Sequence, residues 1–335
     1  MRTIALASFV AASTAAADPS GLQLSKIDMP HHQSETSMAV WYPNGGGGET
    51  TTFGENPVFE GVPAAIGARI RGGTYPVVLF SHGMGGTMYA QAWLGAGLAE
   101  RGAIVVSVNH PNTTWGNFDM SEGVKHWTRA ADLSVALDAL IENPAFAEQI
   151  DRSRIMAAGF SYGGWTALSM GGATGNHKGT VDACLAHEET MEACDMLLSE
   201  KVNIQGLDPS DWNASYSDDR ITHVASIDPG FVWGLAPSDT AGLVPNVLMI
   251  GFGGEADRML ATNFDASGLS GLIDGATFKI FDPAFHFTAM PVCKPAGEAI
   301  LKEEKDDPVC TDPEGTDRSM VHAAIVEAIA EELGL

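Results

Sequence analysis

The sequence predicts an α/β fold in which a mostly parallel central sheet is flanked by helices. Short, continuous apolar runs alternate along the chain with longer stretches of helical periodicity. An apolar run without polar interruptions is typical of a strand that is covered on both faces. Alternation of such strands with helices favours a parallel sheet wrapped by helices. The length of 335 residues is enough to bury a large core without help from a metal or a disulfide.

The expected elements follow one another in a regular order. A first strand at 37–43 precedes a glycine-rich loop, and residues 49–73 have weak periodicity and are expected to cross the surface without regular structure. Apolar runs place the core strands at 76–80, 103–108, 155–160, 223–227, 247–251 and 276–281. Apolar residues at helical spacing place helices at 90–101, 124–141, 165–170 and 320–333.

The alternation breaks between residues 173 and 221, a stretch rich in Asp, Glu and Asn. We expect this stretch to be a lid or cap inserted over the functional site rather than an independent domain. The predicted organisation is therefore a single domain over residues 18–335 that carries the insertion at 173–221.

Residues 1–17 are expected to form a secretory signal peptide. A short basic start is followed by an apolar stretch, and alanines at 15–17 supply small residues before Asp18. The stretch is shorter than the ~20 apolar residues that a bilayer-spanning helix needs, and no transmembrane segment is expected elsewhere. The mature protein is therefore expected in the periplasm or in the external medium.

The cysteines agree with export, and the charge argues against one class of partner. Cys184 and Cys194 are near neighbours in sequence, as are Cys293 and Cys310, so we expect one disulfide within each couple, although sequence alone leaves other pairings open. No CxxC or HxxxH spacing is present, so neither a metal nor another cofactor is expected. A formal net charge of −24 repels phosphate backbones and argues against a nucleic-acid partner.

The most informative motif is Gly159-Phe160-Ser161-Tyr162-Gly163. It follows an apolar run and precedes a helix-like stretch, which gives a strand, a sharp turn and a helix with a serine at the tip. Such a turn lifts the hydroxyl above the sheet, and the flanking glycines let neighbouring backbone pass closely. The pentapeptide is common by chance, but its context predicts that Ser161 is a nucleophile.

A nucleophilic serine needs donors for the developing oxyanion, and a second motif offers them. The glycine-rich sequence Phe80-Ser81-His82-Gly83-Met84-Gly85-Gly86 directly follows the first core strand. A turn in this position donates one backbone N–H, and the residue after the nucleophile donates the other. We therefore expect the amides of Met84 and Tyr162 to form an oxyanion hole. A phosphate-binding role is not supported, because the Lys-Ser/Thr of a Walker motif is absent.

The serine also needs a base, and His286 is the best placed of the 10 histidines. It lies just beyond the last predicted core strand, late in the chain, as a base in this type of site should. His322 lies in the closing helix and is expected to be a surface or packing residue. His110 follows the second core strand and is a candidate for lining the pocket. His31-His32 lies near the start of the mature chain.

Two aspartates compete for the role of orienting that base. Asp228 ends the strand at 223–227, and Asp257 follows the strand at 247–251. Both preserve the chain order serine, aspartate, histidine. Either could instead be a turn residue that hydrogen-bonds its own backbone.

Taken together, these motifs resemble bacterial dienelactone-hydrolase-like α/β hydrolases, and they are similar to the platelet-activating-factor acetylhydrolase and chlorophyllase branches. The resemblance covers most of the mature chain and implies the α/β-hydrolase fold. It is carried by the turn at 80–86, the elbow at 159–164, Ile227-Asp228-Pro229 and His286. Trp41-Tyr42-Pro43 and the C-terminal pattern around Cys293, Cys310, Asp317-Arg318 and His322 look like the bacterial members.

The resemblance also bears on the acid. Dienelactone hydrolase itself uses a cysteine where this chain has Ser161, so dienelactone activity is not implied. In the acetylhydrolase and chlorophyllase branches the acid ends a strand in the position of Asp228, whereas in the polyester-cleaving branch it follows the next strand, in the position of Asp257. The proline that usually stands two or three residues beyond the acid in that last branch is missing here, and we favour Asp228.

The expected function is that of an exported serine carboxylic-ester hydrolase. His286 would deprotonate Ser161, which would attack the ester carbonyl and form an acyl-enzyme that water releases. The substrate would be a small-molecule or lipid ester. A lipase, phospholipase or polyester hydrolase is the alternative among enzymes, and it differs in the acyl pocket that the insertion is expected to control. A non-catalytic binding protein of the same fold is the alternative of another class, and the intact set of candidate residues argues against it.

Overall fold

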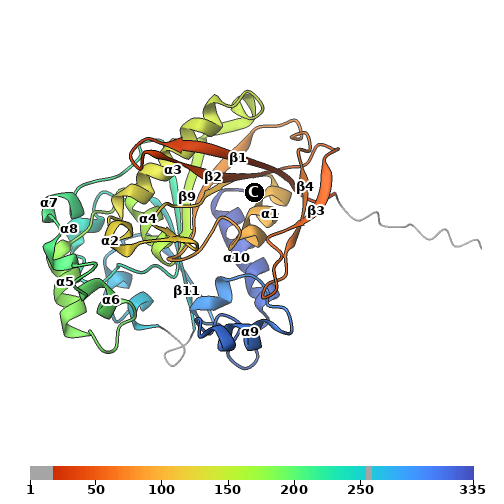
Figure 1. The fold of residues 1–335 in the computed structure, drawn as a ribbon. Coiled ribbons are helices and arrows are strands. Elements are labelled where there is room, and N and C mark those ends of the chain that lie inside the picture. Colours follow the sequence, from red (N-terminus) through yellow and green to blue (C-terminus); the bar gives the residue numbers. More distant parts are fainter. Residues whose placement is uncertain (1–17, 254–258) are drawn as a thin grey trace, which may run out of the picture.

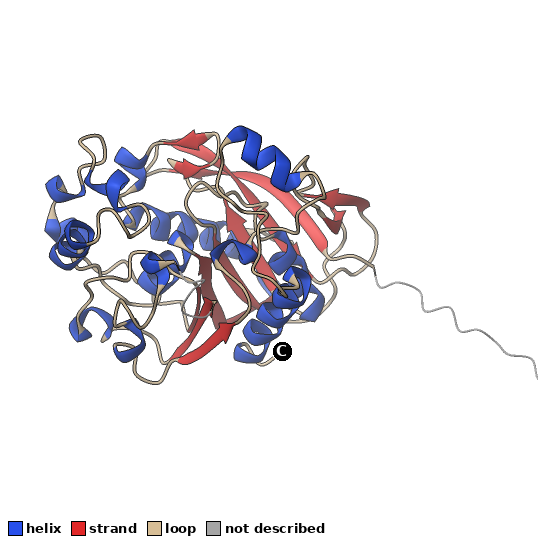
Figure 2. Ribbon diagram, turned by 90° about the horizontal axis from the view of Figure 1, so that it is seen from below, coloured by secondary structure: helices blue, strands red, loops and turns tan. Residues whose placement is uncertain are grey.

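The computed structural model describes residues 18–253 and 259–335 of the chain. Within these residues, a sheet of ten strands crosses the molecule in the order β12-β11-β10-β9-β5-β6-β2-β1-β4-β3. Helices lie on both sides of this sheet (Figures 1 and 2). The expected architecture, a mostly parallel central sheet flanked by helices, is confirmed.

The parallel part of the sheet provides the frame of the candidate site. It consists of β5 (Tyr75–Ser81), β6 (Ile104–Val108), β9 (Ile150–Phe160), β10 (His223–Ile227), β11 (Asn246–Phe252) and β12 (Thr277–Phe281). Each overlaps one of the predicted core runs. The register pairs Ser81 with Gly159 and Phe160 with Ile227, so the carboxyl ends of β5, β9 and β10 lie at one level. Residues that follow these ends are thereby brought together.

The first four strands extend the sheet beyond β6, and two of them correct the expectation for residues 49–73. β1 (Gly21–Met29) and β2 (Ser34–Tyr42) form an antiparallel hairpin, and β2 pairs with β6. β3 (Glu49–Phe53) and β4 (Val62–Ile66) lie in the segment 49–73, so the prediction that this segment lacks regular structure is wrong. Both are short outer strands with several exposed positions, which explains their weak apolar pattern.

Four helices cover the two faces of the sheet in separate layers. They are α1 (Ala92–Arg101), α3 (Trp127–Glu142), α4 (Tyr162–Met170) and α10 (Arg318–Glu332). α1 and α10 pack on the face that carries Val78, whereas α3 and α4 pack on the face that carries Val77. Because successive side chains of a strand point to opposite faces, the continuous apolar run at 76–80 of β5 serves both cores.

The stretch 173–221 forms a group of short helices at one end of the molecule (Figure 1). It contains α5 (His177–Ala186), α6 (Cys194–Leu198), η2 (Ile204–Gly206) and α7 (Pro209–Trp212). Its role as a lid stays a prediction. The remaining short elements are β7 (Thr113–Thr114), β8 (Asn117–Phe118), α2 (Met120–Gly123), η1 (Ala147–Gln149), α8 (Pro237–Thr240), η3 (Leu260–Thr262), η4 (Leu269–Gly271), η5 (His286–Ala289) and α9 (Gly297–Glu304).

Both expected disulfides are present, Cys184–Cys194 between α5 and α6 and Cys293–Cys310 near the C-terminal end.

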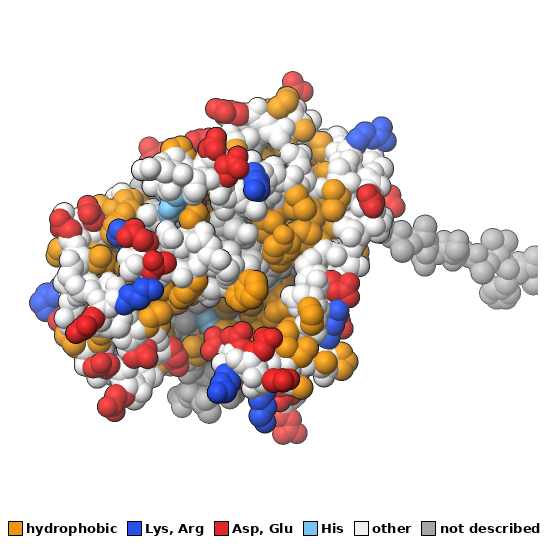
Figure 3. Space-filling view, viewed as in Figure 1, with side chains coloured by type: hydrophobic (Ala, Val, Ile, Leu, Met, Phe, Trp, Pro, Cys, Tyr) orange, Lys and Arg blue, Asp and Glu red, His pale blue; other side chains and the backbone are white. Residues whose placement is uncertain are grey.

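Acidic side chains are scattered over the face shown in Figure 3, in keeping with the net charge of −24. In the ranges that the structure describes, no helix is long and apolar enough to cross a bilayer. The expected signal peptide at 1–17 lies outside the described residues.

Two buried histidines attach helices to the core. His126 precedes α3, and its Nε2–H donates to the carbonyl of Trp212 at 3.0 Å. His322 of α10 stacks on Trp93 with 3.9 Å between ring centroids, and its Nε2–H donates to the carbonyl of Thr288 at 2.7 Å. His322 is therefore a packing residue. Burial lowers the pKa of both imidazoles from 6.5 to about 4, so both are neutral in the folded protein near pH 7.

These lowered pKa values predict that stability falls as the pH is reduced from 6.5 to 4. In that window each histidine binds a proton in the unfolded chain but not in the folded one, so the free energy of unfolding decreases with the pH. The loss per histidine is about 2 kcal/mol at pH 5. Because His322→Gln removes one such titration, urea unfolding at pH 7 and pH 5 should show a pH-dependent loss about 2 kcal/mol smaller than in the wild type. An equal loss in both proteins would contradict this account.

Candidate active site

Ser161 lies at the tip of the turn between β9 and α4, and its side chain is partly exposed. Its backbone has φ 57° and ψ −120°, a conformation that non-glycine residues rarely adopt. Its N–H donates to the carbonyl of Ile227 at 2.8 Å, which ties the turn to the end of β10. A Cβ atom at Gly163 would lie 1.9 Å from the carbonyl oxygen of Ser81, so glycine is required for the turn to pack on β5.

The structure brings Ser161, His286 and Asp228 into one hydrogen-bonded line. The Oγ of Ser161 lies 3.1 Å from Nε2 of His286, and Nδ1 of His286 lies 2.6 Å from Oδ2 of Asp228. Because a carboxylate only accepts, Nδ1–H donates to Asp228 and Nε2 is left to accept from the serine hydroxyl. The His286 ring also packs against Phe160, with 4.6 Å between ring centroids.

Asp228 is buried, with 1% of its surface exposed, and its carboxylate is well supplied with donors. Besides His286, the hydroxyl of Thr262 donates to Oδ2 at 2.8 Å and the N–H of Phe252 donates to Oδ1 at 3.2 Å. A buried carboxylate with such partners is held in one orientation. No sequence signal indicated Thr262, which belongs to η3 far along the chain. Asp257, the other candidate acid, lies outside the described residues.

A hydrogen-bond network fixes the segment that carries His286. The hydroxyl of Thr288, in the same short helix η5, donates to Oδ1 of Asp312 at 2.7 Å. The guanidinium of Arg318 donates to both carboxylate oxygens of Asp312 and to the carbonyl of Pro291. Arg318 is itself buried and belongs to α10. The segment that carries His286 is therefore anchored to the core through a bidentate ion pair rather than being a free loop.

The backbone around Met84 passes close to the serine. A Cβ atom at Gly83 would lie 3.2 Å from Cβ of Ser161, and the turn is tied down by the N–H of Gly85, which donates to the carbonyl of Thr113 at 2.8 Å. Tyr162 is the first residue of α4, so its N–H has no acceptor within the helix. Both amides thus belong to segments that border Ser161, and their role as oxyanion donors remains a proposal.

A second hydrogen-bonded line of a serine, a histidine and an aspartate lies beneath the glycine-rich turn at 81–86, and the sequence analysis did not predict it. The Oγ of Ser81 lies 2.9 Å from Nε2 of His110, and Nδ1 of His110 lies 2.7 Å from Oδ2 of Asp132. Ser81, His110 and Asp132 are all 0% exposed. The guanidinium of Arg129 donates to Oγ of Ser81 at 3.0 Å and to the carbonyl of His82. This network supports the glycine-rich turn from below, and it is closed to solvent.

The network also corrects the expectation for His110. That side chain is enclosed in the core and does not line a pocket. Burial and the nearby Arg129 lower its pKa to about 4, so it stays neutral beside Asp132. A sequence signal for this network did exist, because Arg129 and Asp132 fall on the face of α3 that also buries Leu133 and Leu137.

Comparisons with known proteins find similarity over part of the sequence. The family model of platelet-activating factor acetylhydrolase, isoform II, matches residues 59–116. Over 99 residues, 29% of this chain, the sequence is 35% identical to cutinase 2 of Thermobifida cellulosilytica and 33% identical to cutinase est2 of Thermobifida alba. The matches cover 34% and 30% of those two proteins, so the chain spans about a third of the length of these curated relatives.

The fold is similar to that of a solved ferulic acid esterase from Streptomyces cinnamoneus. The TM-score is 0.61 at 18% sequence identity, over 96% of this chain and 91% of the other. At this level of identity the likeness bears on the fold alone. The chain therefore has the α/β-hydrolase fold and is related, through part of its sequence, to platelet-activating factor acetylhydrolase isoform II and to the cutinases.

Proposed function

We propose that this protein is an exported serine carboxylic-ester hydrolase that works through an acyl-enzyme intermediate. The observation that carries the proposal is the hydrogen-bonded line from Asp228 through His286 to Ser161, which ends on a partly exposed hydroxyl at a strained turn. A serine hydroxyl becomes a useful nucleophile when an adjacent base takes its proton and a third group orients that base.

Each residue of the line has one task in the proposed reaction. Asp228 holds the neutral imidazole of His286 in the tautomer with a proton on Nδ1, so that Nε2 can accept the hydroxyl proton of Ser161. The serine oxygen attacks the ester carbonyl, and the imidazolium then protonates the leaving alcohol. In the deacylation half of the reaction, His286 deprotonates a water that attacks the carbonyl of the acyl-enzyme. The acyl group leaves as the acid, and the proton returns to the oxygen of Ser161.

The amides of Met84 and Tyr162 are proposed to stabilise the oxyanion in both halves. Backbone N–H groups at a fixed position stabilise developing charge without having to reorganise, and loss of one donor in such a site costs about 10²–10³ in rate. The network of Ser81, His110 and Arg129 holds the turn that carries Met84, which gives these buried residues a positioning role.

The insertion is proposed to shape the side of the site near the nucleophile. Trp212 of the insertion lies 6.0 Å from Phe231 between ring centroids, and Phe231 lies 4.7 Å from Tyr162, the residue after the serine. Phe231 is partly exposed, whereas Tyr162 and Trp212 are buried, so the ring of Phe231, backed by Trp212 of the insertion, would limit the acyl group that the site accepts. The sequence similarity to cutinases supports an ester substrate. The two disulfides support export to an oxidising compartment, the periplasm or the medium.

Replacement of the nucleophile tests the reaction class. In Ser161→Ala, hydrolysis of short p-nitrophenyl esters should fall by about 10⁴-fold or more, because no oxygen remains to attack the carbonyl. Ser169→Ala is the matched control, since Ser169 lies in α4 and its buried hydroxyl has no hydrogen-bond partner among the described residues. Equal activity of Ser161→Ala and the wild type would refute the assignment. A wild-type protein that hydrolyses no ester would favour a non-catalytic binding protein.

Replacement of the acid identifies the partner of the base. Asp228→Asn keeps the shape but should favour the wrong tautomer of His286, so we expect kcat to fall by about 10⁴-fold. Asp257→Asn should leave kcat for p-nitrophenyl butyrate within a few-fold of the wild type, and circular dichroism would establish that both variants are folded. Full activity in Asp228→Asn with a large loss in Asp257→Asn would assign the acid to the other aspartate.

A further inference from the structure

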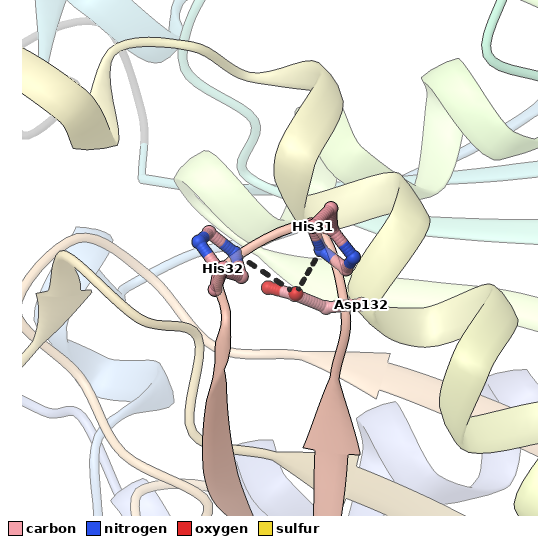
Figure 4. A group of neighbouring side chains, drawn as sticks. All are labelled: His31, His32 and Asp132. Atoms are coloured by element: carbon pink, nitrogen blue, oxygen red, sulfur yellow. Dashed lines mark hydrogen bonds and ion pairs between the residues drawn. The ribbon is translucent and has the colours of Figure 1, made fainter.

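A cluster of potential metal ligands lies where the β1–β2 hairpin meets α3. The turn of this hairpin, at 30–33, carries the adjacent His31 and His32, and α3 supplies Asp132 (Figure 4). Nε2 of His31 lies 2.7 Å from Oδ1 of Asp132, and Nε2 of His32 lies 3.1 Å from the same oxygen. The three possible ligand atoms all lie within 4.8 Å of one another.

The protein groups alone leave one nitrogen of this cluster without a hydrogen bond. His31 donates a hydrogen bond to Oδ1 of Asp132. Nε2 of His32 points at the same oxygen but makes no hydrogen bond with any described residue, although its side chain is only 9% exposed. A buried polar nitrogen without a partner costs free energy and requires an explanation. A cation held between the three atoms would use the lone pairs of both imidazoles and the carboxylate at once.

The donor set selects the class of ion. Two imidazole nitrogens and one carboxylate oxygen suit zinc and its neighbours among the divalent transition metals, whereas calcium and magnesium prefer oxygen ligands. The side chain of His31 is 27% exposed, which leaves the site open to solvent for entry and for a water ligand.

The surroundings of Asp132 are also those of a metal ligand. Its other oxygen, Oδ2, accepts a hydrogen bond from Nδ1–H of His110 at 2.7 Å. Hydrogen bonds of this kind orient ligating carboxylates in metal sites. His110 is itself held by Ser81, so the carboxylate is fixed before an ion arrives.

We propose that His31, His32 and Asp132 bind one divalent transition-metal ion, with zinc as the expected ion. The ion ties the hairpin turn to α3, the helix whose Arg129 supports the turn at 81–86. Its role is structural and independent of the proposed ester hydrolysis. The proposal departs from the expectation of no metal, which rested on the absence of ligand spacings within one short stretch of sequence.

Calorimetric titration with ZnCl₂ tests the proposal. The untagged protein is first stripped with a chelator, and the wild type, His31→Ala, His32→Ala and the control His187→Ala are compared. His187 follows α5 in the insertion and lies outside the cluster. We expect one equivalent of zinc to bind the wild type and His187→Ala, and the affinity to fall at least about 100-fold in each of the other two. CaCl₂ at the same concentrations should give no comparable binding.

Thermal unfolding supplies a second readout on the same proteins. Zinc that binds only the folded state must raise Tm, so it should do so in the wild type and His187→Ala but not in the two cluster variants. Both cluster histidines lie in a hairpin turn, so we expect their replacement to leave the fold intact. The Tm of each variant without zinc shows whether it is folded. The proposal is overturned if the wild type binds no zinc, if both cluster variants bind it as tightly as the wild type, or if His187→Ala loses binding to the same extent.

Discussion

The hydrogen bond between Asp228 and His286 is the interaction on which the proposed chemistry depends. It joins the end of a core strand to a residue that follows β12, 58 positions later in the sequence. The carboxylate is buried and receives two further hydrogen bonds, so it cannot turn away. Thr288, Asp312 and Arg318 hold the other side of the contact through η5. The packing of the core thus fixes His286, the proposed base, in position before any substrate arrives.

The described part of the chain contains two hydrogen-bonded lines of serine, histidine and aspartate, and they differ in burial. Ser161 is partly exposed at the turn between β9 and α4, whereas Ser81 is completely enclosed and accepts a hydrogen bond from Arg129. An enclosed hydroxyl cannot meet a substrate, so the inner line can only support the backbone beside the outer one. We therefore propose that the same constellation of residue types serves chemistry in one place and architecture in the other.

The parts of the molecule that could be predicted from sequence are those encoded locally. Uninterrupted apolar runs reveal buried strands, and the elbow around Ser161 has its own signature. Contacts between distant segments have little signature in the sequence. Thr262, in a short helix of ordinary composition, donates a hydrogen bond to Asp228. The turn that carries His31 and His32 contacts Asp132, about a hundred residues later in the sequence. Such pairings depend on how distant segments pack against one another, and no local sequence pattern indicates this packing.

Covalent labelling followed by peptide mapping is the most direct measurement of the central claim. A fluorophosphonate reacts only with a serine that is both activated and accessible, so it discriminates between the two lines. The account predicts a single adduct on Ser161 of the wild type and none in His286→Ala. An adduct on Ser81, or undiminished labelling of Ser161 after loss of the imidazole, would contradict it.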